Sequence, residues 1–318
     1  MTGKGEKGFT LIELLVAMLL GLVVLAGIYS FYVSSGQVYA LQDQLLETQQ
    51  NLRIALELLV EDVQVAGGNG IPAAAAVTVT NFSTAPDSLD LLSPVSVCPP
   101  STPQVIPIVT YDGVEANMTL SSGSTCPAMV GKVGIAVTAD GLDYRTMQIT
   151  TVTTTTNTIT FTSGVSPLYS TGGLAANYTN GTLALVRKVE YTIDLAVAAK
   201  PVLRRNLYDG TGAQPLANYI EDMQVSLGYD RNGDGILTEV GVAANDDEWV
   251  FNVAGESNAT EAPTNLREVK VILVGRTRLQ DSKFQGSLPA ILDRGGGGTD
   301  GYRRKINGTR VKIRNLGT

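Results

Sequence analysis

Gly8-Phe9-Thr10-Leu11-Ile12-Glu13-Leu14-Leu15-Val16-Ala17-Met18 begins an apolar run that extends to Val33 and contains a single charge, Glu13. A short basic leader, residues 1–8, precedes it and ends in Lys7-Gly8. An ordinary secretory signal is cut after its apolar stretch, where small residues mark the site. Here the glycine-marked junction comes before the apolar stretch. Cleavage at Gly8 would therefore leave an apolar helix on the mature chain.

The run from Phe9 to Val33 is long enough to cross a membrane. Its 25 residues would reach roughly 37 Å as a helix, against a hydrocarbon thickness of about 30 Å. A carboxylate inside such a span costs about 2.5–3.5 kcal/mol unless it lies near the interface, so Glu13 needs a partner. Without the leader this chain has no cation nearby. The partner is then interfacial water or the new α-amino group of Phe9 on a neighbouring copy, which predicts a protein that stacks.

The segment Gly8–Met18 resembles the class III prepilin signature of type IV pilins and of the pseudopilins of type II secretion. The resemblance implies cleavage after Gly8 by a prepilin peptidase, N-methylation of Phe9 and a role for Glu13 in docking each subunit into a filament. It also implies a single-pass inner-membrane protein whose head lies in the periplasm before it joins a pilus at the cell surface. Two alternatives are an ordinary signal anchor and a signal cut near Ser34-Ser35-Gly36.

Composition restricts the function of the rest of the chain. The net charge is −7 and the pI about 4.8, which makes nucleic acid an unfavourable partner for the body of the protein. The chain has no histidine, so it lacks the usual general base, the Ser-His-Asp triad and most zinc sites. Neighbouring acids such as Asp246 and Asp247 have no accompanying nucleophile and base. We therefore expect neither an enzyme nor a small-molecule substrate.

Two cysteines, Cys98 and Cys126, lie in a region rich in proline and serine. In an oxidising periplasm such an even pair predicts a disulfide, which would stabilise the fold by roughly 3–4 kcal/mol on the loop-entropy estimate. Two free thiols are the alternative.

The helical pattern continues past the membrane segment, through residues 34–67. Apolar positions recur there at spacings of three and four, with polar residues opposite them. Gly67-Gly68-Asn69-Gly70 and Pro72 end the helix, because glycine supplies a left-handed cap and proline cannot continue the hydrogen bonding. We expect this half to pack on its own head rather than to form a coiled coil.

Residues 68–318 show short β-type runs separated by turn residues. Examples are Thr150–Thr162 with a turn at Asn157, Leu183–Ile193 and Val269–Val274. The predicted fold class is α+β: a long N-terminal pilin helix, with a transmembrane half and an amphipathic half, packed on a mostly antiparallel β-sheet head.

Three later stretches resemble the minor pilins called PilW and, more loosely, J-type pseudopilins: residues 220–235, residues 266–271, and residues 302–305 with 309–316. This resemblance implies a minor pilin that helps initiate or cap a type IV pilus, with other minor and major pilins as partners. The alternatives are a J-like type II secretion pseudopilin and a pilus-tip adhesin or DNA-binding module. Residues 71–219 resemble nothing that we can name.

The loop Asp230-Arg231-Asn232-Gly233-Asp234-Gly235 has the first half of an EF-hand pattern. Asp230, Asn232 and Asp234 alternate, so a tight turn aims their oxygens at one centre, and the carbonyl of Ile236 can follow as a ligand. The twelfth position is Gly241 rather than glutamate, so another acidic side chain would have to complete the coordination of the calcium ion. The candidates are Glu239, Asp246, Asp247 and Glu248. We expect a structural Ca²⁺; an Asx-rich turn without an ion is the alternative.

The C-terminal end is basic. Arg310, Lys312 and Arg314 alternate with Val311 and Ile313, and Arg303-Arg304-Lys305 precedes them. This pattern predicts an edge strand protected from aggregation by charge. The alternative is a contact with DNA, an anionic sugar or an acidic neighbouring pilin.

Overall fold

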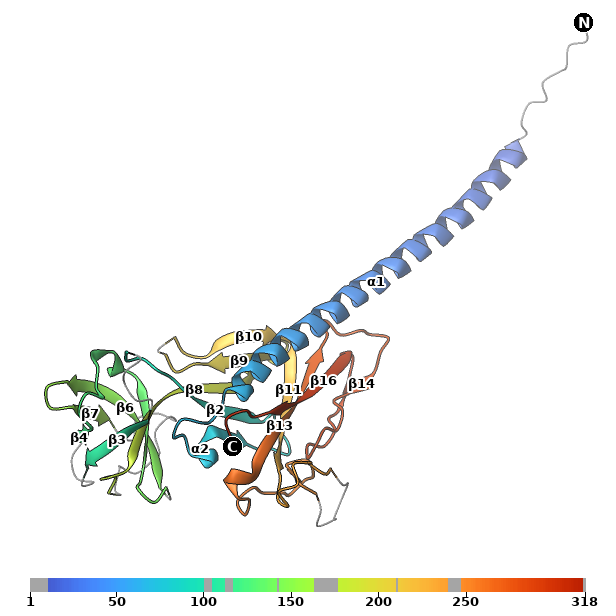
Figure 1. Ribbon diagram of the computed structural model, residues 1–318. Coiled ribbons are helices and arrows are strands. Elements are labelled where there is room, and N and C mark those ends of the chain that lie inside the picture. Colours follow the sequence, from blue (N-terminus) through green and yellow to red (C-terminus); the bar gives the residue numbers. More distant parts are fainter. Residues whose placement is uncertain are drawn as a thin grey trace, which may run out of the picture. The chain divides into compact units, whose positions relative to one another are not determined.

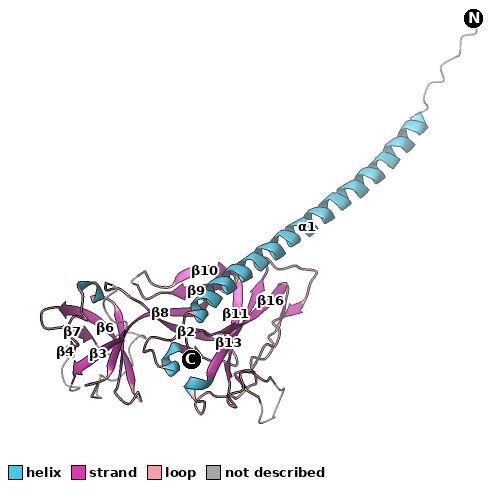
Figure 2. Cartoon of the chain, in the orientation of Figure 1, coloured by secondary structure: helices cyan, strands magenta, loops and turns pink. Residues whose placement is uncertain are grey.

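The computed structural model describes residues 11–99, 105–111, 117–141, 143–162, 177–209, 211–239 and 247–316. Helix α1 runs from Leu11 to Gln64 (Figure 1). The chain forms two compact units, Met1–Glu47 and Thr48–Thr318, and the division falls within α1. The last third of the helix therefore belongs to the same unit as the β-rich head. Helix followed by antiparallel sheet is the predicted fold class, and Figure 2 shows this distribution.

The head-packed part of α1 has the apolar face that the sequence predicts from Thr48 onward. Its buried residues are Thr48, Leu52, Ala55, Leu56, Leu59, Asp62 and Val63. The helix ends before a glycine-rich turn, as predicted, and Gly67 has a φ of 77°. A Cβ at Gly67 would lie 2.7 Å from Cδ2 of Leu316. The positive φ favours glycine there, and a side chain at this position would also displace Leu316.

The first sheet contains most of the strands. Strands β1 and β2 pair with each other, β2 and β9 pair with β8, and β10 pairs with β9, all antiparallel. The bounds are β1 Val77–Thr80, β2 Ser88–Pro94, β3 Val105–Thr110, β4 Asn117–Leu120, β5 Val133–Val137, β6 Tyr144–Thr153, β7 Thr158–Thr162, β8 Thr182–Asp194, β9 Val202–Asn206 and β10 Gln214–Asn218. The short helix α2, Ala73–Ala76, precedes β1, and the 3₁₀ turn η1, Pro127–Met129, precedes β5.

Part of this sheet closes on itself into a small barrel. The strands pair around a ring in the order β8, β3, β4, β7, β6 and β5, and β5 pairs back to β8. The interior is one apolar cluster that includes Met118, Met147, Ile159 and Phe161. The predicted turn at Asn157 joins β6 to β7, and Asn157 has a φ of 52°.

Strand β8 belongs to both the barrel and the open part of the sheet. Its first half pairs with β3 and β5, and its second half pairs with β2 and β9. Leu183 and Leu185 enter the barrel core, whereas Ala184 and Val186 enter the main core on the other face. Because both faces are buried there, the stretch Leu183–Val186 is continuously apolar instead of alternating.

A second sheet has the order β12, β11, β13, β16. Its strands are β11 Ile220–Tyr229, β12 Trp249–Val250, β13 Leu266–Arg276, which follows the 3₁₀ turn η2 Pro263–Asn265, and β16 Arg304–Lys312. The two short strands β14, Gly286–Ser287, and β15, Thr299–Asp300, pair with each other. A Cβ on Gly275 of β13 would lie 2.8 Å from Thr48 and 3.1 Å from Leu52. The helix therefore lies directly on this sheet, and the absence of a side chain at Gly275 allows the close approach.

The end of the described chain caps the end of α1. The backbone N–H of Arg314 donates to the carbonyl of Gln64 at 3.4 Å, and the Asn315 amide donates to the carbonyl of Val65 at 3.3 Å. The last carbonyls of a helix have no partner within it. These contacts join the helix to the C-terminal strand segment.

Candidate functional site

The N-terminal half of α1 is the first candidate site. Glu13 lies in the first turn of the helix, where the helix dipole favours a negative charge. The stretch that qualifies as a membrane span is 0% buried within the chain itself, and Phe31 and Tyr32 are each 75% exposed. An apolar surface of this size requires lipid or a partner chain to cover it. Gly8 and Phe9, the predicted cleavage and methylation positions, lie outside the described residues.

The other end of α1 carries a buried acid that the periodicity did not identify. Asp62 accepts hydrogen bonds from Nε and Nη2 of Arg205 at 2.8 and 2.9 Å and from the Tyr191 hydroxyl at 2.6 Å. The Arg187 guanidinium lies 3.6 Å away. Burial, and then the bond to Asp62, raise the pKa of Tyr191 above its usual value. In the sequence Asp62 is one more polar residue among glutamates, so nothing marked it as buried.

The predicted calcium loop is present as a chain of Asx turns. Asp230 accepts from the backbone N–H groups of Gly233 at 2.7 Å and Gly235 at 3.2 Å. Asn232 accepts from the N–H of Asp234, and Asp234 accepts from the N–H of Ile236. The structure thus places Asp230, Asn232 and Asp234 in one tight loop, where their side-chain oxygens accept hydrogen bonds from the backbone.

The structure gives the proposed closing acids other partners. Glu239 accepts a hydrogen bond from Lys270 at 2.5 Å and pairs with Arg310. Glu248 accepts from the N–H of Arg231 and of Thr238, both at 3.0 Å, and so closes the loop from the side. Within the described ranges, no three acidic, histidine or cysteine side chains are arranged to hold one metal ion. Calcium binding remains a prediction, and any shell would need oxygens beyond the set Asp230, Asp234 and Glu239.

The basic end is an edge strand, and three of its six cations form ion pairs. Among the described strands, β16 pairs only with β13. Arg303 pairs with Asp281, Arg304 with Glu221 and Asp300, and Arg310 with Glu239. Val311 and Ile313 are buried, in line with the predicted alternation. These partners neutralise much of the positive charge that the sequence suggested for an anionic ligand.

The predicted disulfide between Cys98 and Cys126 is formed, with 5.8 Å between the Cα atoms. Both cysteines pack against the barrel core. The bond therefore fastens the segment before β3 to the turn before β5.

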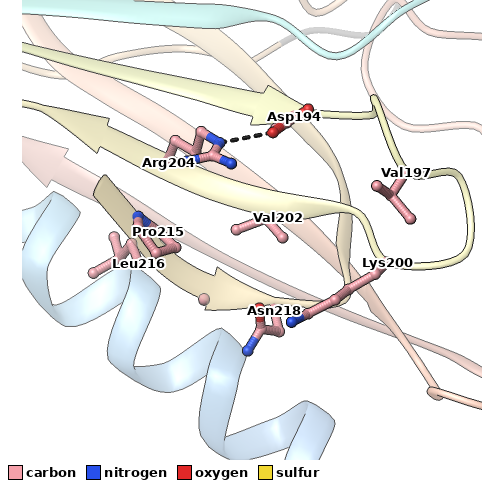
Figure 3. A pocket seen from close by; sticks show the side chains of 9 residues that line it. Asp194, Val197, Lys200, Val202, Arg204, Pro215, Leu216 and Asn218 are labelled. Atoms are coloured by element: carbon pink, nitrogen blue, oxygen red, sulfur yellow. Dashed lines mark hydrogen bonds and ion pairs between the residues drawn. The ribbon is translucent and has the colours of Figure 1, made fainter. Parts of the chain in front are cut away.

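The β9–β10 hairpin and the loop that precedes it line a groove (Figure 3). It has a volume of about 460 Å³, and its lining includes Val202 and Leu216. Arg204 at one end donates to Asp194 at 2.8 Å, and the exposed Lys200 lies at the other end beside Asn218. Because Arg204 and Asp194 neutralise each other, Lys200 gives the groove one net positive charge.

Further buried acids lie in and beside β11 of the second sheet. Asp87 is 1% exposed and accepts from the N–H groups of Phe82 and Val225, both at 2.8 Å. Burial chiefly, with the nearby carboxylates of Asp293 and Asp222, raises the pKa of Asp87 to about 7. Arg294 lies 2.5 Å from Asp222 and supplies positive charge there.

Comparisons with known proteins bear on the N-terminal segment. Residues 3–29 match the family described as "Prokaryotic N-terminal methylation motif". No curated protein matches the chain. A solved structure with some similarity is a type IV-like pilin from Thermus thermophilus, with 8% identity and a TM-score of 0.36 over 85% of this chain and 98% of that one. This chain therefore carries the prepilin methylation motif at the start of a long apolar helix that leads into a β-rich head.

Proposed function

We propose that this chain is a minor pilin of the PilW type that helps initiate or cap a type IV pilus. The observation that supports this proposal best is the combination of the methylation motif with an apolar half-helix that no described residue of the chain covers. Prepilin peptidase would remove residues 1–8, and Phe9 would be methylated. The chain would wait in the inner membrane with its head in the periplasm. Its role is structural, and other minor and major pilins are its partners.

Assembly would depend on Glu13. Its carboxylate would pair with the α-amino group of Phe9 on the neighbouring subunit, which offsets the cost of placing a charge in an apolar environment. The pairing and the burial of the helix among other helices would then occur in one step.

The test is Glu13→Ala, with Glu61→Ala as the matched control, because Glu61 is an exposed acid farther along the same helix. We expect Glu13→Ala to be cleaved after Gly8 as in the wild type, measured by intact mass, but to be absent from sheared filaments. Glu61→Ala should be both cleaved and incorporated. Normal incorporation of Glu13→Ala would refute the assembly mechanism, and an intact leader on the wild-type chain would refute the assignment.

A type II secretion pseudopilin would use the same helix in the same way. Deletion of the gene separates the two functions. Loss of pili with normal secretion supports a pilin, and loss of secretion with normal pili supports a pseudopilin.

A further inference from the structure

We propose that the β9–β10 groove is a docking site for the acidic middle of α1 of a second copy of this chain. The inference rests on the proposed function, since it names a surface through which assembled subunits would meet. Three observations support it: the construction of the groove, its charge, and the pattern of the helix segment that would fill it.

The groove is held in place by its own hydrogen bonds. Asp194 accepts from the N–H of Ala196 at 2.8 Å, and the N–H of Lys200 donates to the carbonyl of Val197 at 2.8 Å. The Arg276 guanidinium donates to the carbonyl of Ala198 between them. The loop that carries Lys200 is thus tied at three points. A preformed surface loses less entropy when a partner binds.

The charge of the groove is opposite to that of the protein as a whole. Lys200 is exposed and forms no ion pair with any described residue. The same loop carries two exposed apolar side chains: Val197, which also lines the groove, is 60% exposed, and Leu195 is 48% exposed. On a chain of net charge −7, this is a local site that favours an acidic and partly apolar partner.

The middle of α1 has the complementary pattern. Tyr39, Asp43 and Leu46 follow one another at spacings of four and three, so they share one face of the helix. Tyr39 is 71% exposed and Leu46 is 57% exposed. No lysine or arginine occurs between Lys7 and Arg53, so the segment carries only negative charge. A carboxylate between two exposed apolar side chains would meet the ammonium of Lys200 in a groove that the exposed Val197 also lines.

The test is cysteine cross-linking between two differently tagged full-length chains in the same membrane. One carries Val197→Cys and the other Leu46→Cys; the native cysteines are already paired, so no other thiol competes. We expect a disulfide-linked heterodimer on mild oxidation. Thr153→Cys, an exposed position on the barrel, replaces Val197→Cys as the matched control and should give none.

Charge reversal tests the recognition itself. Lys200→Glu in the first chain should lower the cross-linked yield about fivefold, the upper range for an exposed ion pair. Asp43→Lys in the second chain should do the same, and the two together should restore the yield. Lys283→Glu, an exposed lysine elsewhere, should have no effect.

Any of three results would overturn the inference. The cross-linked yield could be unchanged by Lys200→Glu, Thr153→Cys could give an equal yield, or cross-linking could occur only to a different pilin. Leader cleavage and filament incorporation are read in the same samples. If these fail in the wild type, the proposed function fails. If they succeed while the groove variants change nothing, only the inference fails.

Discussion

Asp62 joins α1 to the head through buried hydrogen bonds. Its buried carboxylate receives a two-pronged bond from Arg205 and one from Tyr191. We expect Asp62→Ala to lower the free energy of unfolding by about 3 kcal/mol, because it leaves a guanidinium and a hydroxyl without their partner. Denaturant titration of the detergent-solubilised chain measures this. The neighbouring exposed acid provides the control: Glu61→Ala should stay within about 0.5 kcal/mol of wild type. Equal effects would show that the contact stabilises little.

Asp87 predicts a dependence of stability on pH. Its carboxyl ionises near pH 3.9 in an unfolded chain, whereas its pKa in the fold is about 7. Between these values the unfolded state binds fewer protons, so the free energy of unfolding falls as pH rises, by about 1.4 kcal/mol per pH unit from this group. The negative charges of Asp222 and Asp293 also raise the pKa of Asp87. Arg294 pairs with Asp222, and its positive charge acts in the opposite direction.

Melting temperature should therefore fall between pH 5 and pH 7.5. In Asp87→Asn the fall should be smaller, because the replacement does not ionise. A slope identical to that of the wild type would mean that other groups set the dependence. Sequence alone could not single out this residue, since Asp87 looks like a turn aspartate between two strands.

At the scale of elements, local patterns were reliable predictors. Glycine with proline predicts where α1 stops, and Asn157 predicts the turn between β6 and β7; both are confirmed. The amphipathic face is confirmed from Thr48 onward. Earlier positions of the same stripe are more open, and Val38 is 50% exposed. Periodicity indicates which residues can share a face, but it does not say what covers that face.

The Asp230–Gly235 loop gives a prediction at this scale. If it holds calcium, millimolar Ca²⁺ should raise the melting temperature of the detergent-solubilised chain, because a ligand at 100 times its Kd contributes about 2.7 kcal/mol. Asp234→Asn keeps an acceptor for the N–H of Ile236 but removes a charge, and should abolish the rise. Magnesium serves as the control ion. No change in melting temperature with calcium would leave an Asx-rich turn closed by Glu248 as the description of this loop.

For the whole molecule, the sequence predicted a β-rich head but not that part of it closes into a barrel. Closure depends on β5 meeting β8, and β3 meeting β8 from the other side. These pairings join segments far apart in the chain. Alternation of side chains indicates that a segment is a strand, but it does not indicate which strands will pair. The apolar run at Leu183–Val186 did contain a signal, because an antiparallel strand without alternation is buried on both faces.

The shared strand also predicts how the head unfolds. Since β8 contributes to both cores, the barrel and the rest of the head should melt in one transition, with equal calorimetric and van't Hoff enthalpies. Trp249, the only tryptophan in the sequence, lies in the second sheet and reports on the part outside the barrel. Ile159→Ala in the barrel core should destabilise by about 2–5 kcal/mol and should shift the Trp249 fluorescence transition equally. Two separate transitions would show that the barrel unfolds by itself.

Because β8 belongs to both the barrel and the open part of the sheet, insertions into this strand should be poorly tolerated. A foreign peptide inserted where the barrel meets the open sheet would interrupt β8. The barrel and the open part of the sheet would then both lose a strand. The tip of the β6–β7 hairpin, Thr154–Thr156, is exposed and remote from β8 in the pairing order. An inserted peptide should be tolerated better there than within β8. Both engineered insertions and natural sequence variation should therefore be tolerated at the β6–β7 tip and not within β8.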